Sequence, residues 1–173
     1  MTTPSLLLVD ATFELLDAAV NDSSKLASLL RASVEEDWAG FPEALPALRA
    51  SYSDRPSAHR WGTIFFLTAS PRVLVGLGGY KGSPSSEGVV EIGYAIAHAF
   101  RGKGLATEAA RQMVQRAFSD TQVRAVDAHT LAQDNPSTRV LEKLGFRKIG
   151  QRTDPDDGEI WHWRRSRDNA NGS

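Results

Sequence analysis

The sequence contains no cysteine among its 173 residues. Disulfide bonds, thiolate metal ligands and a cysteine nucleophile are therefore excluded together. Histidines are few, and their spacing is not that of metal ligands, so we predict no metal site. All four are interpreted as ordinary surface or strand positions: His59, His98, His129 and His162.

An excess of charge of either sign is missing as well. The 20 lysines and arginines nearly balance the 21 aspartates and glutamates, which leaves a formal net charge of -1. Such a balance gives no electrostatic reason to expect a nucleic acid or a membrane surface as a partner. The composition, with 41% apolar and 24% charged residues, is ordinary for a soluble globular protein.

Long apolar runs are also missing, since the longest fall well short of the roughly 20 residues that cross a bilayer. The segment from Met1 to Pro4 does not read as the start of a signal peptide, and we expect a cytoplasmic protein. A chain of this length suits one domain with one core, predicted to span residues 1–167. The polar residues from Asp168 to Ser173 are expected to form a disordered tail.

The periodicity of apolar residues predicts an α+β domain. Alternating β-branched and aromatic residues predict strands, and apolar residues three and four apart predict helices. The strands are expected at residues 6–9, 63–68, 73–80, 89–96, 124–130, 146–152 and 159–163. The helices are expected after the capping residues 21–23, within 34–57, at 104–118 and from Asn135 to Gly145. The segment Phe13–Leu16 is expected to extend or follow the first strand.

The strand expected at residues 89–96 carries a carboxylate beside small residues. Glu91 shares one face of this strand with Gly93 and Ala95, which leave room for a ligand above that face. This position makes Glu91 a candidate general base. The alternative is a carboxylate at the strand edge that is held in a salt bridge.

A glycine-containing segment, Arg101 to Thr107, joins that strand to the long helix. Gly102 and Gly104 allow the backbone to approach a ligand closely, and the first amides of the helix carry the positive end of its dipole. Phosphates bind well to such a site, to which Arg101 adds a positive charge and Thr107 a hydroxyl. The plain alternative is a turn that only connects two elements.

Two other phosphate motifs fit this segment poorly. A P-loop requires serine or threonine after its lysine, whereas Lys103 is followed by Gly104. The first glycine of that motif is also missing at the required spacing before Lys103. The dinucleotide fingerprint Gly-x-Gly-x-x-Gly is matched by Gly102 and Gly104, but Thr107 stands at its third glycine. The dinucleotide fingerprint stays open as the weaker alternative.

The pattern Arg101-x-x-Gly104-x-Ala106 resembles the acyl-CoA signature Arg/Gln-x-x-Gly-x-Gly/Ala of the GNAT acetyltransferase superfamily. Other segments agree with the superfamily in the same order, and the resemblance is strong from about Gly79 to Trp163. These segments are Val90–Tyr94, Ala106–Ala109 and Asn135–Phe146. The whole set is similar to the branch related to ribosomal-protein N-terminal acetyltransferases.

The resemblance implies both a fold and a donor substrate. The implied fold is a single domain whose mixed, mainly antiparallel sheet has helices on both faces and splays between the strand ending near Ile96 and the strand from Arg124. Acetyl-CoA would lie in that cleft as the acetyl donor. Its pantetheine arm would pair with the backbone of Tyr94, Ala95 and Ile96 and would meet Asn135. Its pyrophosphate would sit on Arg101, Gly102, Lys103, Gly104, Leu105, Ala106 and Thr107.

The absence of cysteine also bears on the chemistry, because an acyl-thiol enzyme intermediate cannot form. We therefore expect direct attack of a primary amine on acetyl-CoA, which the resemblance also implies. Glu91 is the candidate base, and Ser137, in the first turn of its helix, is a candidate to stabilise or protonate the leaving thiolate. Many superfamily members have a tyrosine as general acid at the position of Leu141. This departure leaves open a second hypothesis, a non-catalytic acyl-CoA-binding module.

The sequence does not identify the acceptor amine, which leaves four alternatives: a protein N-terminus, an antibiotic amine, a polyamine and an amino acid. Trp38 and Trp61 lie in the variable N-terminal part, where superfamily members build the acceptor site, and core positions are an equal alternative. Trp161 and Trp163 alternate along a strand and are expected in the core or at a homodimer contact.

Overall fold

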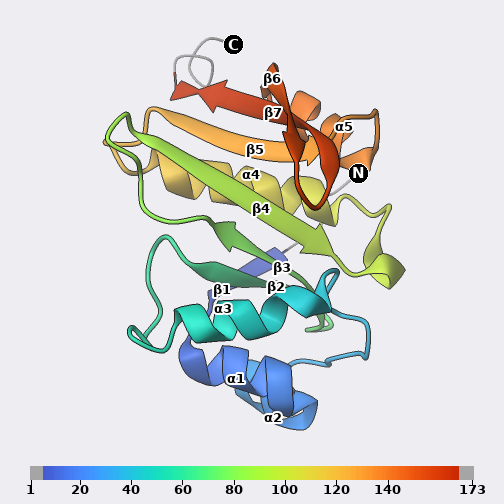
Figure 1. Ribbon diagram of the computed structural model, residues 1–173. Coiled ribbons are helices and arrows are strands. Elements are labelled where there is room, and N and C mark those ends of the chain that lie inside the picture. The colour runs from blue at the N-terminus through green and yellow to red at the C-terminus, as the bar shows by residue number, and fades with distance from the viewer. Residues whose placement is uncertain (1–5, 168–173) are drawn as a thin grey trace. The chain divides into compact units, whose positions relative to one another are not determined.

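The computed structural model describes residues 6–167, which contain seven strands and five α-helices (Figure 1). In chain order these are β1 (Leu6–Asp10), α1 (Phe13–Asn21), α2 (Ser23–Leu30), α3 (Leu45–Ser51), β2 (Thr63–Thr68), β3 (Leu74–Tyr80), β4 (Val89–Ile96), α4 (Leu105–Phe118), β5 (Ala125–Leu131), α5 (Pro136–Lys143), β6 (Arg147–Asp154) and β7 (Gly158–Ser166). Two short 3₁₀ helices, η1 (Pro42–Ala44) and η2 (His98–Phe100), precede α3 and α4. The disordered tail predicted from Asp168 lies outside the described residues.

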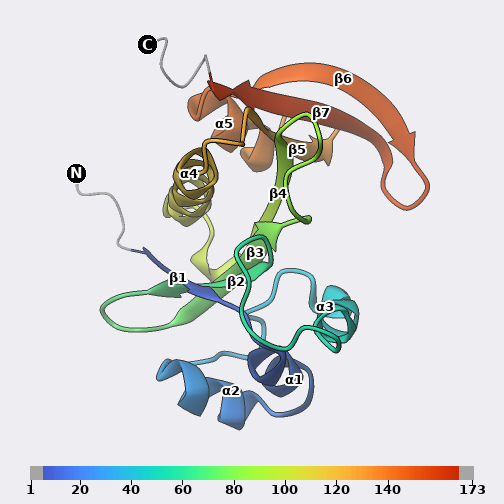
Figure 2. The ribbon, with the colours of Figure 1, turned by 90° about the vertical axis from the view of Figure 1, so that its left-hand side faces the viewer.

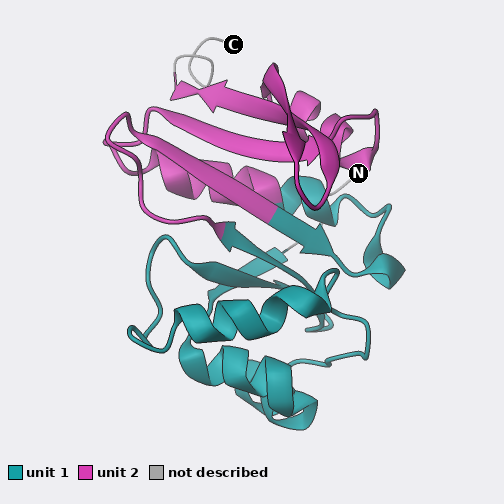
Figure 3. Cartoon of the chain, in the orientation of Figure 1, with its two compact units in different colours: residues 1–79, 94–109 teal, residues 80–93, 110–173 magenta. Residues whose placement is uncertain are grey.

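The described chain forms two compact units (Figure 3). Unit 1 takes its residues from 1–79 and 94–109, and unit 2 takes them from 80–93 and 110–173, so β4 and α4 contribute to both. Hydrogen-bonded strands follow the order β1-β2-β3-β4-β5-β7-β6. β4 and β5 are parallel, whereas β1–β2, β2–β3, β5–β7 and β6–β7 are antiparallel. The predicted α+β class with a mixed, mainly antiparallel sheet is confirmed.

Unit 1 is organised around the antiparallel strands β1, β2 and β3. Residues 64–67 of β2 are fully buried, as expected for the middle strand of three with apolar side chains on both faces. The helices α1, α2 and α3 add their apolar faces to these strands (Figure 2). The core of unit 1 includes Leu16, Leu26, Trp38, Leu45, Tyr52, Phe65, Leu67 and Leu74.

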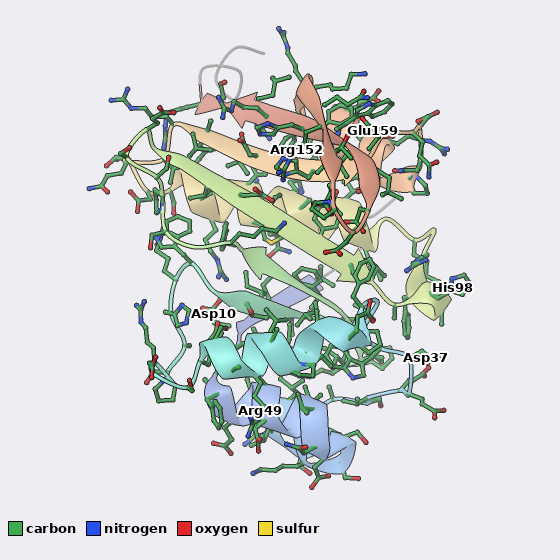
Figure 4. All side chains as sticks on the ribbon, viewed as in Figure 1. Asp10, Asp37, Arg49, His98, Arg152 and Glu159 are labelled. Carbon is green, nitrogen blue, oxygen red and sulfur yellow. The ribbon has the colours of Figure 1, made fainter. Side chains whose placement is uncertain are left out.

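One element of unit 1 differs from the expectation. The segment Phe13–Leu16 does not extend β1 but forms the first turn of helix α1. The side chain of Thr12 accepts a hydrogen bond from the amide of Leu15, which caps the helix at this point. An ion pair of 2.7 Å between Arg49 Nε and Asp17 Oδ1 then ties α3 to α1; Arg49 is marked in Figure 4.

Unit 2 contains the first part of β4, followed by β5, β7 and β6. Val89 to Glu91 pair in parallel with Ala125 to Asp127, and all of β5 pairs with β7. The parallel register of β4 and β5 thus ends at Glu91 and Asp127.

Helix α5 of unit 2 has the ends that its sequence predicts. Asn135 caps it through a hydrogen bond of 3.0 Å from the amide of Thr138 to Asn135 Oδ1, and Pro136 occupies the first turn. The amide of Asn135 in return donates to Thr138 Oγ1 at 3.0 Å, which completes a reciprocal cap. Leu141 is fully buried, so this residue has a core position in α5.

Candidate functional site

The predicted anion site lies at the N-terminus of α4, in unit 1. Gly102 and Gly104 have φ angles of 77° and 79°, a left-handed conformation that side chains disfavour. A Cβ atom placed at Gly102 would meet no other atom within 4 Å, so the space over this turn is open. The first backbone hydrogen bond of α4 runs from Glu108 N to Gly104 O at 3.1 Å. The amides of Leu105, Ala106 and Thr107 therefore precede the regular hydrogen-bonding pattern of the helix.

The two basic residues of this segment are exposed, and both have contacts within unit 1. Arg101 Nε donates a hydrogen bond of 3.0 Å to the carbonyl of Ile96, which fastens the segment to the end of β4. Lys103 Nζ lies 5.5 Å from the centre of the Phe100 ring. The turn thus combines open space, helix-terminal amides and two cationic side chains, which is a chemically suitable setting for a pyrophosphate.

The end of β4, predicted to pair with the pantetheine arm, belongs to unit 1 as well. Tyr94 and Ala95 are partly exposed, whereas Ile96 is buried. The amide of Ala97 donates to the carbonyl of Val75 at 2.7 Å, so β3 holds one edge of this segment. Unit 1 therefore contains the whole predicted donor-binding set except Asn135.

The remaining predicted residues, Glu91, Asn135 and Ser137, belong to unit 2. Asn135 and Ser137 are both partly exposed at the start of α5. Because Oδ1 of Asn135 accepts from Thr138, its capping role is confirmed, and its contact with the pantetheine arm stays a prediction.

Glu91 makes two contacts with nitrogen atoms. Its Oε2 lies 2.7 Å from Lys81 Nζ, which follows β3, and 3.1 Å from Nδ1 of His129 on β5. The side chain of Glu91 keeps 27% of its exposure. Burial alone would raise the pKa of Glu91, but the hydrogen bond and charge of Lys81, together with the charge of His129, outweigh it and lower the pKa. Glu91 is thus an ionised carboxylate in a salt bridge, and this contact is compatible with the proposed role as a base.

A second carboxylate extends this cluster across β5 and β7. Asp127 accepts from Arg164 Nε at 2.7 Å and from Arg164 Nη2 at 3.0 Å, and its Oδ2 lies 2.6 Å from His162 Nε2. The hydrogen bonds to Asp127 raise the pKa of Arg164. The rings of His129 and His162 stack with centroids 4.5 Å apart. We call the six residues the polar cluster: Lys81, Glu91, Asp127, His129, His162 and Arg164.

Apart from Glu91, the polar cluster was missed by reasoning from the sequence. A signal for it exists, because Asp127 and His129 share one face of β5, and His162 and Arg164 share one face of β7. The pairing register that places Asp127 opposite Arg164, and His129 opposite His162, comes only from the structure. The description of these two histidines as strand positions is confirmed.

The polar cluster supports a prediction on stability. Asp127→Asn is expected to lower the free energy of unfolding by about 1–3 kcal/mol, because it leaves Arg164 without its charged partner. This is less than the roughly 3–5 kcal/mol for a fully buried pair, since the Arg164 side chain is 35% exposed. Urea unfolding followed by circular dichroism measures the change. Asp157→Asn, in the exposed β6–β7 turn, is the control, and a difference below about 0.5 kcal/mol would contradict the prediction.

Three of the tryptophans fit core or strand positions. Trp38 is buried in the core of unit 1, and Trp163 is buried and donates a hydrogen bond of 2.9 Å to Thr130 Oγ1. Trp161 is partly exposed and donates to Gln151 Oε1 at 3.0 Å. The core alternative thus holds for Trp38 and Trp163, and the homodimer contact stays a prediction.

Within residues 6–167, no three histidine, aspartate or glutamate side chains are grouped so that they could hold a metal ion. No helix in the same range is long and apolar enough to span a bilayer.

Residues 14–147 match the family described as an acetyltransferase (GNAT) domain. A relative named uncharacterized N-acetyltransferase YjdG, from Bacillus subtilis (strain 168), is 28% identical over 84% of this chain and 88% of its own length. The putative ribosomal N-acetyltransferase YdaF of the same organism is 36% identical over 37% of this chain and 35% of its own. A crystal structure of aminoglycoside acetyltransferase AAC(6')-Ib in complex with coenzyme A superposes with a TM-score of 0.66 at 18% identity, covering 98% of this chain and 99% of that one.

Proposed function

Because the chain belongs to the GNAT acetyltransferase family, we propose that it transfers the acetyl group of acetyl-CoA directly to a primary amine. The observation that carries this proposal is the turn before α4, where Gly102 and Gly104 adopt left-handed conformations beside the amides of a helix N-terminus. This geometry supports the binding of an anion such as a pyrophosphate.

Each residue of the donor-binding segment has a distinct role in the proposal. The amides of Leu105, Ala106 and Thr107 donate to the pyrophosphate oxygens, and the helix dipole adds to this attraction. Arg101 holds the turn against the end of β4 through Ile96 O, and its charge favours the anion. The backbone of Tyr94, Ala95 and Ile96, together with Asn135, orients the pantetheine arm.

The acceptor amine has to lose protons in this reaction. An alkyl ammonium is mostly protonated at neutral pH, so one proton leaves before attack and a second leaves when the amide forms. In the proposal Glu91 takes a proton directly or through one water. Its position supports this role, because a Cβ atom at Gly93 would meet only Lys81 Cε, at 3.7 Å. The face beside Glu91 therefore has room for a small group.

The leaving thiolate needs a stabilising group, and we assign that role to Ser137. It lies in the first turn of α5, where amides add a positive potential. Leu141, at the position of the usual tyrosine, is fully buried and has no acidic group. Thiolate protonation in this protein thus depends on the Ser137 hydroxyl or on water.

We further propose that the acceptor is a protein N-terminus or a small-molecule amine. Incubation with acetyl-CoA and a panel of peptides, polyamines, amino acids and aminoglycosides, with detection of released thiol, tests this proposal. Thiol release with an amine of the panel supports the enzyme. Coenzyme A binding without thiol release from any amine would favour the non-catalytic acyl-CoA-binding module.

Ligand-dependent melting tests the identity of the donor. Coenzyme A, but not NAD, is expected to raise the melting temperature, because only coenzyme A has a pantetheine arm that can pair with the backbone of Tyr94, Ala95 and Ile96 in addition to its pyrophosphate. At 100 times its dissociation constant, a ligand adds about 2.7 kcal/mol to the free energy of unfolding. Differential scanning fluorimetry with each ligand measures the shift. A shift with NAD and none with coenzyme A would support the dinucleotide fingerprint instead.

A further inference from the structure

The polar cluster of unit 2 contains an imidazole nitrogen that the proposed reaction does not yet use. Nδ1 of His129 is buried and lacks a hydrogen-bond partner of good geometry among the described residues, although Oε2 of Glu91 is only 3.1 Å away. A buried polar atom without a hydrogen bond is uncommon, and such atoms occur at catalytic sites. We infer that His129 stores the proton that Glu91 takes from the acceptor amine, while His162 and Asp127 position its ring.

The geometry suits a transfer from Glu91 to His129. A protonated Glu91 carboxyl would face the lone pair of Nδ1 across 3.1 Å, close to hydrogen-bonding distance. Once the proton has moved, the imidazolium and the Glu91 carboxylate carry opposite charges 3.1 Å apart and attract each other. The His129 side chain keeps 15% of its exposure, at atoms other than the buried Nδ1. Proton uptake therefore places a positive charge beside the Glu91 carboxylate, which favours the protonated ring.

The electrostatics of Glu91 explain why a second group is useful. Lys81 holds the pKa of the Glu91 carboxyl below its usual value, so this carboxyl does not retain a proton at neutral pH. An imidazole in water titrates near pH 6.5 and retains a proton far better than a carboxylate does. Glu91 then takes the proton from the amine, and His129 holds this proton until it is released to solvent.

The charges around His129 are balanced, so they do not prevent this ring from accepting one proton. The groups that face it are Glu91 from β4 and His162 from β7, with Lys81, Asp127 and Arg164 one contact further away. Glu91 is compensated by Lys81, and Asp127 is compensated by Arg164. Nε2 of His162 lies 2.6 Å from Asp127 Oδ2, and this contact holds the His162 ring in place. Since the His129 and His162 rings stack with centroids 4.5 Å apart, positive charge on both rings at once would be repulsive.

The inference rests on the proposed function, and the reaction balances as follows. The nitrogen of the neutral amine forms a bond to the acetyl carbon, and the carbon–sulfur bond of the thioester breaks. The proton lost from nitrogen passes to Glu91 and then to Nδ1 of His129, while the thiolate takes a proton from Ser137 or water. Release of the His129 proton to solvent, together with return of a proton to Ser137 or to the hydroxide formed from water, restores the starting state. The overall change converts R–NH₂ and acetyl-CoA into R–NH–COCH₃ and CoA–SH.

Replacement of His129 by asparagine tests whether His129 accepts the proton. Asparagine keeps a polar atom near the position of Nδ1 but cannot titrate, so turnover at pH 7 is expected to fall roughly 10²-fold. If His129 accepts the proton, the pH profile of wild-type kcat should contain an ionisation that is absent from the profile of the variant. Acetyl-CoA affinity should stay unchanged. His98→Gln is the control, since His98 is exposed on η2 in unit 1 (Figure 4).

A double variant separates a shared route from two independent effects. If Glu91 and His129 act in sequence, Glu91→Gln combined with His129→Asn should lose no more turnover than the more damaging single change. Multiplied losses would overturn the inference. A kcat of His129→Asn that is unchanged, or that falls equally at every pH, would also overturn it, because the latter result indicates a structural role only.

Histidine-ring NMR of the native protein gives a readout that does not need turnover. The ring resonances assigned to His129 should shift in Glu91→Gln, because the carboxylate 3.1 Å from Nδ1 is removed, whereas those of His98 should not move. Unmoved His129 resonances would overturn the inference even if His129→Asn fails to fold. If the wild-type protein binds coenzyme A but acetylates no amine, the proposed function is wrong, and the proton transfer from Glu91 to His129 is wrong with it. Normal wild-type turnover together with unchanged turnover of His129→Asn would overturn only the proton transfer from Glu91 to His129 and would leave the proposed function intact.

Discussion

Glu91→Gln is expected to reduce turnover at pH 7 by roughly 10²–10⁴-fold, the usual contribution of a positioned acid–base group. Glutamine keeps the size of the side chain and removes its ability to accept a proton. It also removes the charge that pairs with Lys81 at 2.7 Å, but Lys81 is 62% exposed and remains solvated. The fold and the proposed donor-binding turn, which lies in unit 1, should therefore persist. Steady-state kinetics and calorimetry with acetyl-CoA measure the two effects separately.

The pH dependence of Glu91→Gln has a defined sign. The pKa of Glu91 is lowered, so the wild-type carboxylate is fully ionised at neutral pH and its own ionisation adds no pH dependence there. In the variant, raising the pH should recover part of the lost rate, because more of the amine is then neutral without a base. Glu87→Gln, in the exposed turn before β4, is the matched control. Full activity of Glu91→Gln at pH 7 would leave Glu91 with only its salt-bridge role.

The segments that the sequence predicted best are those whose signal is local. The turn before α4 follows from two glycines, two basic residues and a change of period within a few positions. The start of α5 follows from Asn135 and Pro136, and the structure shows the expected cap. Such features depend on residues close together in the chain, which a linear pattern records.

The polar cluster was not predictable in the same way, because three strands create it. Lys81, Glu91, Asp127 and His162 are far apart in the chain, and only the register of β4, β5 and β7 brings them together. A shift of one residue in either register would turn the side chains of one strand to the opposite face. Helix α1 was also missed. The apolar residues of Phe13–Leu16 suit a strand as well as a helix, and the capping hydrogen bond of Thr12, which starts the helix, is visible only in the structure.

The turn before α4 provides the other large expected effect. Gly104→Val is expected to weaken acetyl-CoA binding by at least roughly 10²-fold, or about 2.7 kcal/mol. Valine disfavours the φ angle of 79° that Gly104 adopts, so the turn must change its backbone path. The amides of Leu105 and Ala106 would then no longer point together at the pyrophosphate, and each hydrogen bond to a charged group contributes about 1.5–3 kcal/mol.

A matched control separates the loss of the binding site from the strain of the substitution itself. Gly158, the first residue of β7 in unit 2, has a φ angle of 76°, and a Cβ atom placed there would meet no other atom within 4 Å, so Gly158→Val imposes a similar backbone strain. Both variants should therefore lose comparable stability, measured by urea unfolding, while only Gly104→Val loses acetyl-CoA affinity, measured by calorimetry. Unchanged affinity in a folded Gly104→Val protein would mean that the phosphate groups bind elsewhere. Equal loss of affinity in both variants would mean that general destabilisation, rather than the geometry of the turn, limits binding.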